Sequence, residues 1–231
     1  MANSSESVPP PAAGTEREKI IAAFMELLGE RRFEELDFPT VAERAGVPLD
    51  RCRAEFDSLF SVLAAQIEDT DRKVLAGRDA DMAEEPARER LFDVLMRRLE
   101  ILAPHKPAIR SLARSVRCNP ALALALNALT VRSQTWMLDA AGISTAGLKG
   151  AVRAQGMACL YANVLRVWVE DDDPGLARTM AALDRQLARG AWWAGRLDDL
   201  CMLVPGGGGR GRWRPRQERR RDEPGQQPAV V

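Results

Sequence analysis

The chain has 231 residues, of which 46% are hydrophobic, and its 33 basic side chains equal its 33 acidic ones in number. A chain of this length can bury a sizeable core, as one large domain or two modest ones, and its zero net charge favours no particular partner. A single tyrosine and few runs of β-branched residues point to an all-helical protein.

The four cysteines lie far apart and form no CxxC pair, and the chain has one histidine, His105. This usage argues against a zinc site and fits a reducing compartment. The first fourteen residues, MANSSESVPPPAAG, are polar and proline-rich without the apolar region of a signal peptide, so we expect a disordered leader at 1–14. Because no apolar run is long enough to span a bilayer, we predict a cytoplasmic protein without a transmembrane segment.

The sequence offers little to an enzyme. It contains neither the GxSxG nucleophile motif nor a P-loop. His105 lies between two prolines in a predicted turn, and acidic pairs and runs at 34–35, 84–85 and 171–173 are explained by solvated turns and helix caps. We therefore expect no catalytic residue, no metal site and no cofactor.

The first predicted helix, at about 15–30, is followed by FPTVAERAGVPLDRCRAEF, which predicts two short helices joined by a tight turn. Asp37 can cap the first helix of this pair, and Pro39 occupies its first turn, where a missing N–H costs nothing. Gly46 suits the positive φ of the turn, and Pro48 opens the second helix. The pattern is that of a helix-turn-helix, whose second helix would lie in the DNA major groove.

This pair and the segment before it, REKIIAAFMELLGERRFEELDF, resemble the N-terminal module of the TetR family of transcriptional regulators. Phe56 and Leu63 fall on apolar positions of that family's fourth helix. The resemblance implies an all-α, TetR-like fold of about nine helices, with a three-helix helix-turn-helix domain at 15–77 and a C-terminal helical bundle at 86–204. It also implies a site for operator DNA, made of Thr40, Arg44, Pro48, Leu49, Asp50, Arg51 and Arg53.

Several positions depart from the family pattern. Leu49, Asp50 and Arg53 stand where a small or basic residue, a glycine and a tyrosine are usual, and Leu59 replaces a lysine that meets a phosphate. Residues 1–60 have seven basic and twelve acidic side chains and hence a net charge of −5. DNA-reading modules usually gain affinity from phosphate contacts and are basic on the groove side. Operator binding and its loss are therefore both open.

An acidic loop, GRDADMAEEP, separates the two predicted domains, and Pro86 begins the larger one. We expect its helices at about 86–103, 108–116, 120–141, 145–170 and 174–203. The remainder, at 205–231, is rich in glycine and arginine with a net charge of +4 and is predicted to be a disordered tail.

Long and flexible apolar side chains recur on the predicted helices of the bundle and suit an adaptable cavity. From these residues alone, an ordinary packed core is the favoured explanation. The TetR resemblance adds the expectation of a small-molecule pocket, with ligand contacts from Leu95, Met96, Leu99, Leu126, Leu129, Met137, Met157, Leu160, Leu165 and Trp168.

The segment WVEDDDPGLARTMAALDRQL, at 168–187, is similar to the closing motif of a TetR-fold family of lipid-binding proteins that assists ubiquinone biosynthesis. The matching residues are Trp168, Asp171, Asp172, Pro174, Thr179, Leu183, Asp184 and Arg185. The segment RLFDVLMRRLEILAPHKPAIRSL is similar to another part of that family. Met180 and Ala182 replace its usual aromatic residues, and its C-terminal membrane helix is not evident. This second resemblance implies a lipid or isoprenoid ligand.

Two functions follow from these resemblances. The first is a TetR-like DNA-binding regulator that responds to an apolar small molecule; the alternative is a TetR-fold lipid-binding protein related to ubiquinone biosynthesis that has lost operator binding. For either, we expect a homodimer formed by the helices at 145–170 and 174–193, with Trp192 and Trp193 at the edge of its interface.

Overall fold

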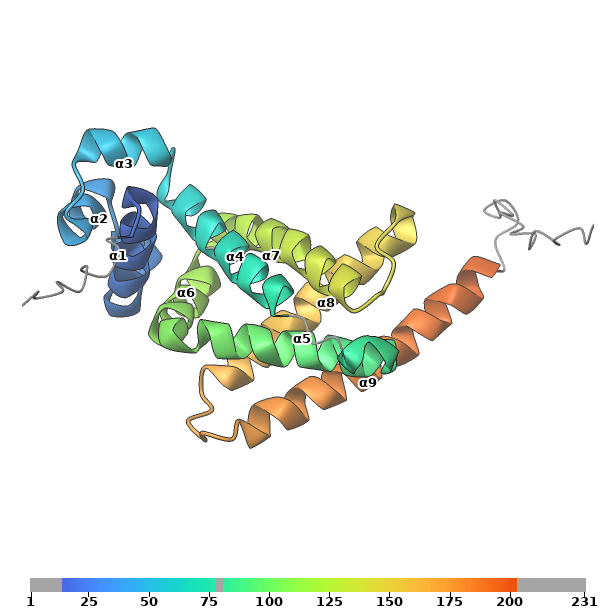
Figure 1. Ribbon diagram of the computed structural model, residues 1–231. Coiled ribbons are helices and arrows are strands. Elements are labelled where there is room, and N and C mark those ends of the chain that lie inside the picture. The colour runs from blue at the N-terminus through green and yellow to red at the C-terminus, as the bar shows by residue number, and fades with distance from the viewer. Residues whose placement is uncertain (1–13, 78–80, 203–231) are drawn as a thin grey trace, which may run out of the picture. The chain divides into compact units, whose positions relative to one another are not determined.

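A computed structural model describes residues 14–77 and 81–202, including their side chains except those of 81, 83 and 191–202 (Figure 1). The predicted tail at 205–231, the side chains of Trp192 and Trp193, and all but the last residue of the predicted leader lie outside this description. The described residues form nine α-helices and three short 3-10 helices, and contain no strand. The predicted all-helical fold is thereby confirmed.

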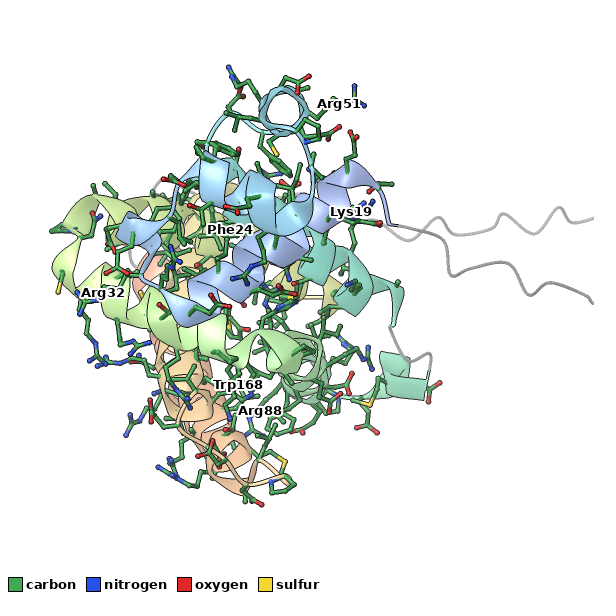
Figure 2. The ribbon with its side chains drawn as sticks, turned by 90° about the vertical axis from the view of Figure 1, so that its left-hand side faces the viewer. Lys19, Phe24, Arg32, Arg51, Arg88 and Trp168 are labelled. Atoms are coloured by element: carbon green, nitrogen blue, oxygen red, sulfur yellow. The ribbon has the colours of Figure 1, made fainter. Side chains whose placement is uncertain are left out.

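Helix α1 (Glu16–Glu30) begins with a capping box formed by Thr15 and Glu18. The Thr15 hydroxyl accepts a hydrogen bond from the Glu18 amide at 3.3 Å, and the Glu18 carboxylate accepts one from the Thr15 amide at 2.9 Å. One face of the helix is buried, and Phe24 on that face is completely covered. Figure 2 shows Phe24 in the interior of the N-terminal group of helices.

Helices α2 (Phe38–Ala45) and α3 (Leu49–Glu55) form the predicted helix-turn-helix. The Asp37 carboxylate accepts a hydrogen bond from the Thr40 amide at 2.9 Å and so caps α2. Gly46 has a φ of +63°, the left-handed conformation that the turn requires and that glycine adopts without strain. Val47 and Cys52 are buried and fix α3 against its neighbours. We call α1, α2 and α3 the helix-turn-helix module.

The remaining helices follow the predicted order, with shifted ends. They are α4 (Leu59–Ala76), α5 (Ala87–Leu102), α6 (Lys106–Cys118), α7 (Pro120–Ala140), α8 (Gly147–Trp168) and α9 (Ala177–Met202). The largest shift is at α9, which we expected to begin at 174. The Asp173 carboxylate instead accepts hydrogen bonds from the amides of Gly175 and Ala177, and Leu176 has a φ of +49°, so a turn precedes the helix.

The predicted boundary between 77 and 86 falls at the end of α4, yet the helices on its two sides share a core. Ala108 and Leu112 of α6 belong to the same buried cluster as Phe24 and Leu28 of α1. Gly29 permits this close approach, because a Cβ there would lie 3.3 Å from the Cβ of Pro107. One compact unit accordingly extends through the module and the bundle to Ala194, and a second begins at Gly195.

Hydrogen bonds reinforce the contact between α1 and α6. The Ser111 hydroxyl donates to the Arg31 carbonyl at 2.6 Å, and the Ser115 hydroxyl accepts from the Phe33 amide at 3.1 Å. Both serines are buried, so these bonds satisfy polar groups that water does not reach. Within the described residues, no helix is both long and apolar enough to cross a membrane.

Candidate ligand cavity and helix-turn-helix surface

A cavity of about 330 Å³ lies among the helices of the bundle. Helices α4, α5, α6, α7 and α8 supply its walls, and Met25 of α1 closes one side. Its apolar lining includes Leu63, Ile67, Leu102, Ile109, Leu112, Val116, Leu126, Leu165 and Val169. The volume is at the lower end of the roughly 300–1,000 Å³ typical of ligand pockets. The cavity can therefore hold a small, largely apolar molecule.

A buried ion pair stands beside this apolar wall. Arg98 of α5, which lines the cavity, donates through Nη1 to the Asp71 carboxylate of α4, and the two side chains are 5% and 9% exposed. The Ser133 hydroxyl donates to the same carboxylate oxygen at 2.9 Å. The positive charge of Arg98 is thus compensated inside the protein.

Tyr161 of α8 lines the cavity beside this ion pair. The Arg98 guanidinium carbon lies 5.5 Å from the centre of the Tyr161 ring, a cation–π distance. Burial raises the pKa of Tyr161, although the neighbouring Arg98 charge opposes this, and the phenol is therefore neutral near neutral pH. Burial and Lys73 lower the pKa of His105, which lies outside the cavity lining.

The residues predicted to contact a ligand lie in three different environments. Leu126 and Leu165 lie on the cavity wall, and Leu129 lines a second, more polar cavity of about 420 Å³ between α4 and α7. The others belong to or pack against the central core: Leu95, Met96, Leu99, Met137, Met157, Leu160 and Trp168. Their contact with a ligand stays a prediction, and their positions favour a packing role. Helical periodicity identifies the buried face of each helix, but it does not reveal where facing helices leave space.

The three arginines predicted to meet DNA are bound to carboxylates. Arg44 donates to both carboxylate oxygens of Glu30, at 2.9 and 3.1 Å, and this hydrogen bonding lowers the pKa of Glu30. Arg51 pairs with Glu16 of α1 at 3.0 Å, and Arg53 pairs with Asp57. Figure 2 shows Arg51 on α3 at the outer edge of the module. Exposed pairs of this kind contribute little to stability, and phosphate can compete for them.

The other predicted DNA contacts lie around the turn and the start of α3. Pro48, Leu49 and Asp50 are exposed, and Leu49 has half of its surface accessible to solvent. Thr40 is partly buried, and its amide is already bound by Asp37. DNA contact by each of them stays a prediction.

The segment at 168–187 forms the corner that carries the chain from α8 into α9. The Asp171 carboxylate is buried and accepts hydrogen bonds from the Thr179 amide at 2.9 Å and the Thr179 hydroxyl at 2.6 Å. These bonds hold the pKa of Asp171 below its usual range. Lys106 of α6 donates to the Asp171 carbonyl and lies 5.5 Å from the ring centre of the buried Trp168.

A salt bridge adds to this corner. Arg88 of α5 binds Asp184 of α9, with 2.5 Å between Nη2 and Oδ1. Figure 2 labels Arg88 and Trp168. Four residues of the motif, Trp168, Asp171, Thr179 and Leu183, are buried. Packing and capping therefore account for these four positions without a ligand. The similarity to a lipid-binding family stays a prediction.

We did not predict from the sequence the buried ion pair beside the cavity or the arginines of its lining. Arg98 and Asp71 each lie on the apolar face of an amphipathic helix, and a charged residue on such a face is the signal that could have revealed their pairing. Arg117 and Arg166 also line the cavity, and both are exposed. Nothing in their local sequence distinguishes them from other surface arginines, so only the tertiary structure places them together.

No protein-family model matches the chain, and no curated protein matches it. Solved structures do resemble it. A TetR transcriptional regulator from Nitrosomonas europaea ATCC 19718 has a TM-score of 0.61 at 21% identity, covering 78% of this chain and 99% of that chain. A TetR transcriptional regulator from Rhodococcus sp. RHA1 has a TM-score of 0.54 at 19% identity, covering 76% of this chain and 95% of that chain. A tetR-family transcriptional regulator from Streptomyces coelicolor has a TM-score of 0.50 at 15% identity, covering 83% of this chain and 89% of that chain. At these identities the likeness shows a TetR-like fold.

Proposed function

We propose that this chain is a ligand-responsive transcriptional regulator, in which an apolar small molecule bound in the cavity controls DNA binding by the helix-turn-helix module. The observation that carries the proposal is the composition of the cavity wall. Met25 comes from α1 of the module, and Leu63, Gln66, Ile67 and Thr70 come from α4, which directly follows the module.

This arrangement supplies a physical route from ligand to DNA. A molecule that fills the cavity pushes on α4 and α6, and α6 shares a buried core with α1. Packed cores respond to added volume by small rigid shifts of whole helices, not by local compression. The ligand would change DNA affinity only as far as it binds the two positions of the module with different affinities.

A second candidate is a carrier of apolar molecules of the lipid or isoprenoid class that does not read an operator. The pairing of Arg44, Arg51 and Arg53 with carboxylates of their own region favours it, as does the net charge of −5 over residues 1–60. The similarity of 168–187 to the ubiquinone-associated family points the same way. In this function the cavity is retained, and the module serves only to stabilise the fold.

Selection of binding sites from random DNA duplexes separates the two candidates. The full-length chain and a version ending at Pro205 are both used, because the arginine-rich remainder can attract any DNA through phosphate charge alone. A regulator should enrich a palindromic site with both versions. The carrier should bind weakly, without sequence preference and only with the tail present. No enrichment with either version would contradict operator binding.

We also propose a homodimer formed by α8 and α9, the arrangement expected from the sequence. Exposed apolar side chains support it: Leu148 and Val152 on α8 are 82% and 46% exposed, and Met180 on α9 is 38% exposed. A second copy could cover them. Sedimentation or light scattering should give a dimer mass at micromolar concentration, and Leu148→Glu should shift it toward the monomer. A monomer mass for the unmodified chain would rule the interface out.

A further inference from the structure

We propose that the molecule bound in the cavity is an amphipathic anion, with an apolar body inside and an acidic head group held by Arg117 and Arg166. This inference rests on the proposed apolar-ligand function and adds the chemical class of the ligand. It begins from the charges around the cavity. Among the described residues, three arginines line it, Arg98, Arg117 and Arg166, and no aspartate or glutamate does.

The inner arginine is not available to a charged ligand. Arg98 already binds Asp71, and an anion placed beside this pair would meet the buried carboxylate of Asp71 in a low-dielectric environment. The two outer arginines differ. Within the described part of the chain, neither Arg117 nor Arg166 forms an ion pair or a hydrogen bond to a carboxylate. No carboxylate of the described residues therefore lies within ion-pair distance of either guanidinium.

Helical spacing places both outer arginines on the faces that line the cavity. On α6, Ala113, Val116 and Arg117 follow a spacing of three and four residues, as do Ala162, Leu165 and Arg166 on α8. Because both arginines are exposed while their apolar neighbours line the same space, they mark its opening to solvent. The small side chains of Ala113 and Ala162 leave room there.

The chemistry of the ligand follows from this geometry. A fully apolar molecule satisfies the wall but leaves two arginines beside it unused, and a cation is repelled by both. A carboxylate or phosphate at the opening forms charge-assisted hydrogen bonds with them, stronger because the apolar wall excludes part of the water. The tail then extends along Leu126 and Leu112 toward the interior.

The test compares decanoate with decanol, two probes that share a chain and differ in the charge of the head group. Calorimetric titration of the full-length protein should give decanoate an affinity at least about tenfold higher, with the preference falling as salt concentration rises. Decyl phosphate, measured in parallel, shows whether the opening prefers a phosphate to a carboxylate. Probe concentrations stay below those at which micelles form.

Matched variants assign the preference to the two arginines. The double variant Arg117→Gln, Arg166→Gln should lose the preference for decanoate and bind decanol as before. Arg114→Gln is the control, because Arg114 is also an exposed arginine of α6 but does not line the cavity. It should retain the preference.

The outcomes separate this inference from the function on which it rests. Equal affinity for decanoate and decanol, or a preference that survives in the double variant, would overturn the anionic head group and leave the apolar cavity intact. Failure of both probes to bind would overturn the ligand-binding function as well. All of the altered side chains are exposed, and thermal unfolding of each variant verifies that it remains folded.

Discussion

The arginines of the helix-turn-helix module and those of the cavity opening differ in whether a carboxylate binds them. On the module, Arg44, Arg51 and Arg53 are bound by carboxylates that the same region supplies. At the opening, Arg117 and Arg166 have no carboxylate partner among the described residues. Positive charge is therefore ready for an external partner at the cavity, whereas on α3 a partner has to displace an existing one. The regulator and carrier hypotheses differ in whether DNA can do so.

The largest expected effect concerns the buried ion pair of Asp71 on α4 and Arg98 on α5. Asp71→Asn should lower the free energy of unfolding by about 3–5 kcal/mol, because it leaves Arg98 buried without its counter-charge. Urea denaturation measures the change. Glu68→Gln is the control, since Glu68 also lies on α4 but binds Arg132 in an exposed pair, and should change stability little. Equal effects would show that Arg98 is not buried as the structure has it.

The second-largest effect is expected from a substitution that fills the cavity. Ala113→Phe adds a ring at the wall and should weaken decanoate binding at least about tenfold while leaving the protein folded. Met157→Trp is the contrasting change, since Met157 is 5% exposed in the packed core and the larger ring should cost about 1–3 kcal/mol of stability. Titration and thermal unfolding of both variants measure the difference. Unimpaired binding by Ala113→Phe would place the ligand elsewhere.

A smaller effect with a defined pH dependence is expected at the corner before α9. Hydrogen bonds from Thr179 favour the ionised Asp171 and lower its pKa, so their contribution is complete above the ordinary Asp pKa of about 3.9. It is lost as the pH falls through the lower pKa of the folded state. Thr179→Val should therefore lower Tm near neutral pH, and its deficit should narrow below about pH 4.

Thr135→Val provides the control for this pH dependence. The Thr135 hydroxyl donates to the Val131 carbonyl within α7 at 3.0 Å, and no carboxylate is involved. The effect of Thr135→Val on Tm should be the same near neutral pH and below about pH 4. A Thr179→Val deficit that stays constant with pH would mean that the hydroxyl acts by packing alone.

The smallest expected effect bears on DNA. Glu16→Gln removes the partner of Arg51 and should raise the affinity for a DNA duplex about threefold at low salt. Glu43→Gln makes the same change of charge on α2, where the described residues show no ion pair to Glu43, and should raise affinity less. Fluorescence anisotropy at several salt concentrations compares them. Equal gains would indicate that only total charge matters, as the carrier hypothesis expects.

Local sequence determined the secondary structure and the helix-turn-helix. Asp37 and Gly46 each act through a hydrogen bond or a backbone angle within a few residues, and both were identified from the sequence. The start of α9 was placed three residues too early. Asp173-Pro174-Gly175 suits a turn as well as a helix start, and the Asp173 carboxylate accepts hydrogen bonds from the amides of Gly175 and Ala177, so the turn continues to Leu176.

Only the tertiary structure decided where the cavity lies and which arginines are paired. Leu165 on the cavity wall and Leu160 in the core are both apolar residues of α8, and only the packing of the neighbouring helices decides which of them borders empty space. The pairing of Arg51 with Glu16 joins residues far apart in sequence, as does the shared opening formed by Arg117 and Arg166. Periodicity reports which face of a helix is buried, whereas empty space and charge compensation depend on how several helices meet.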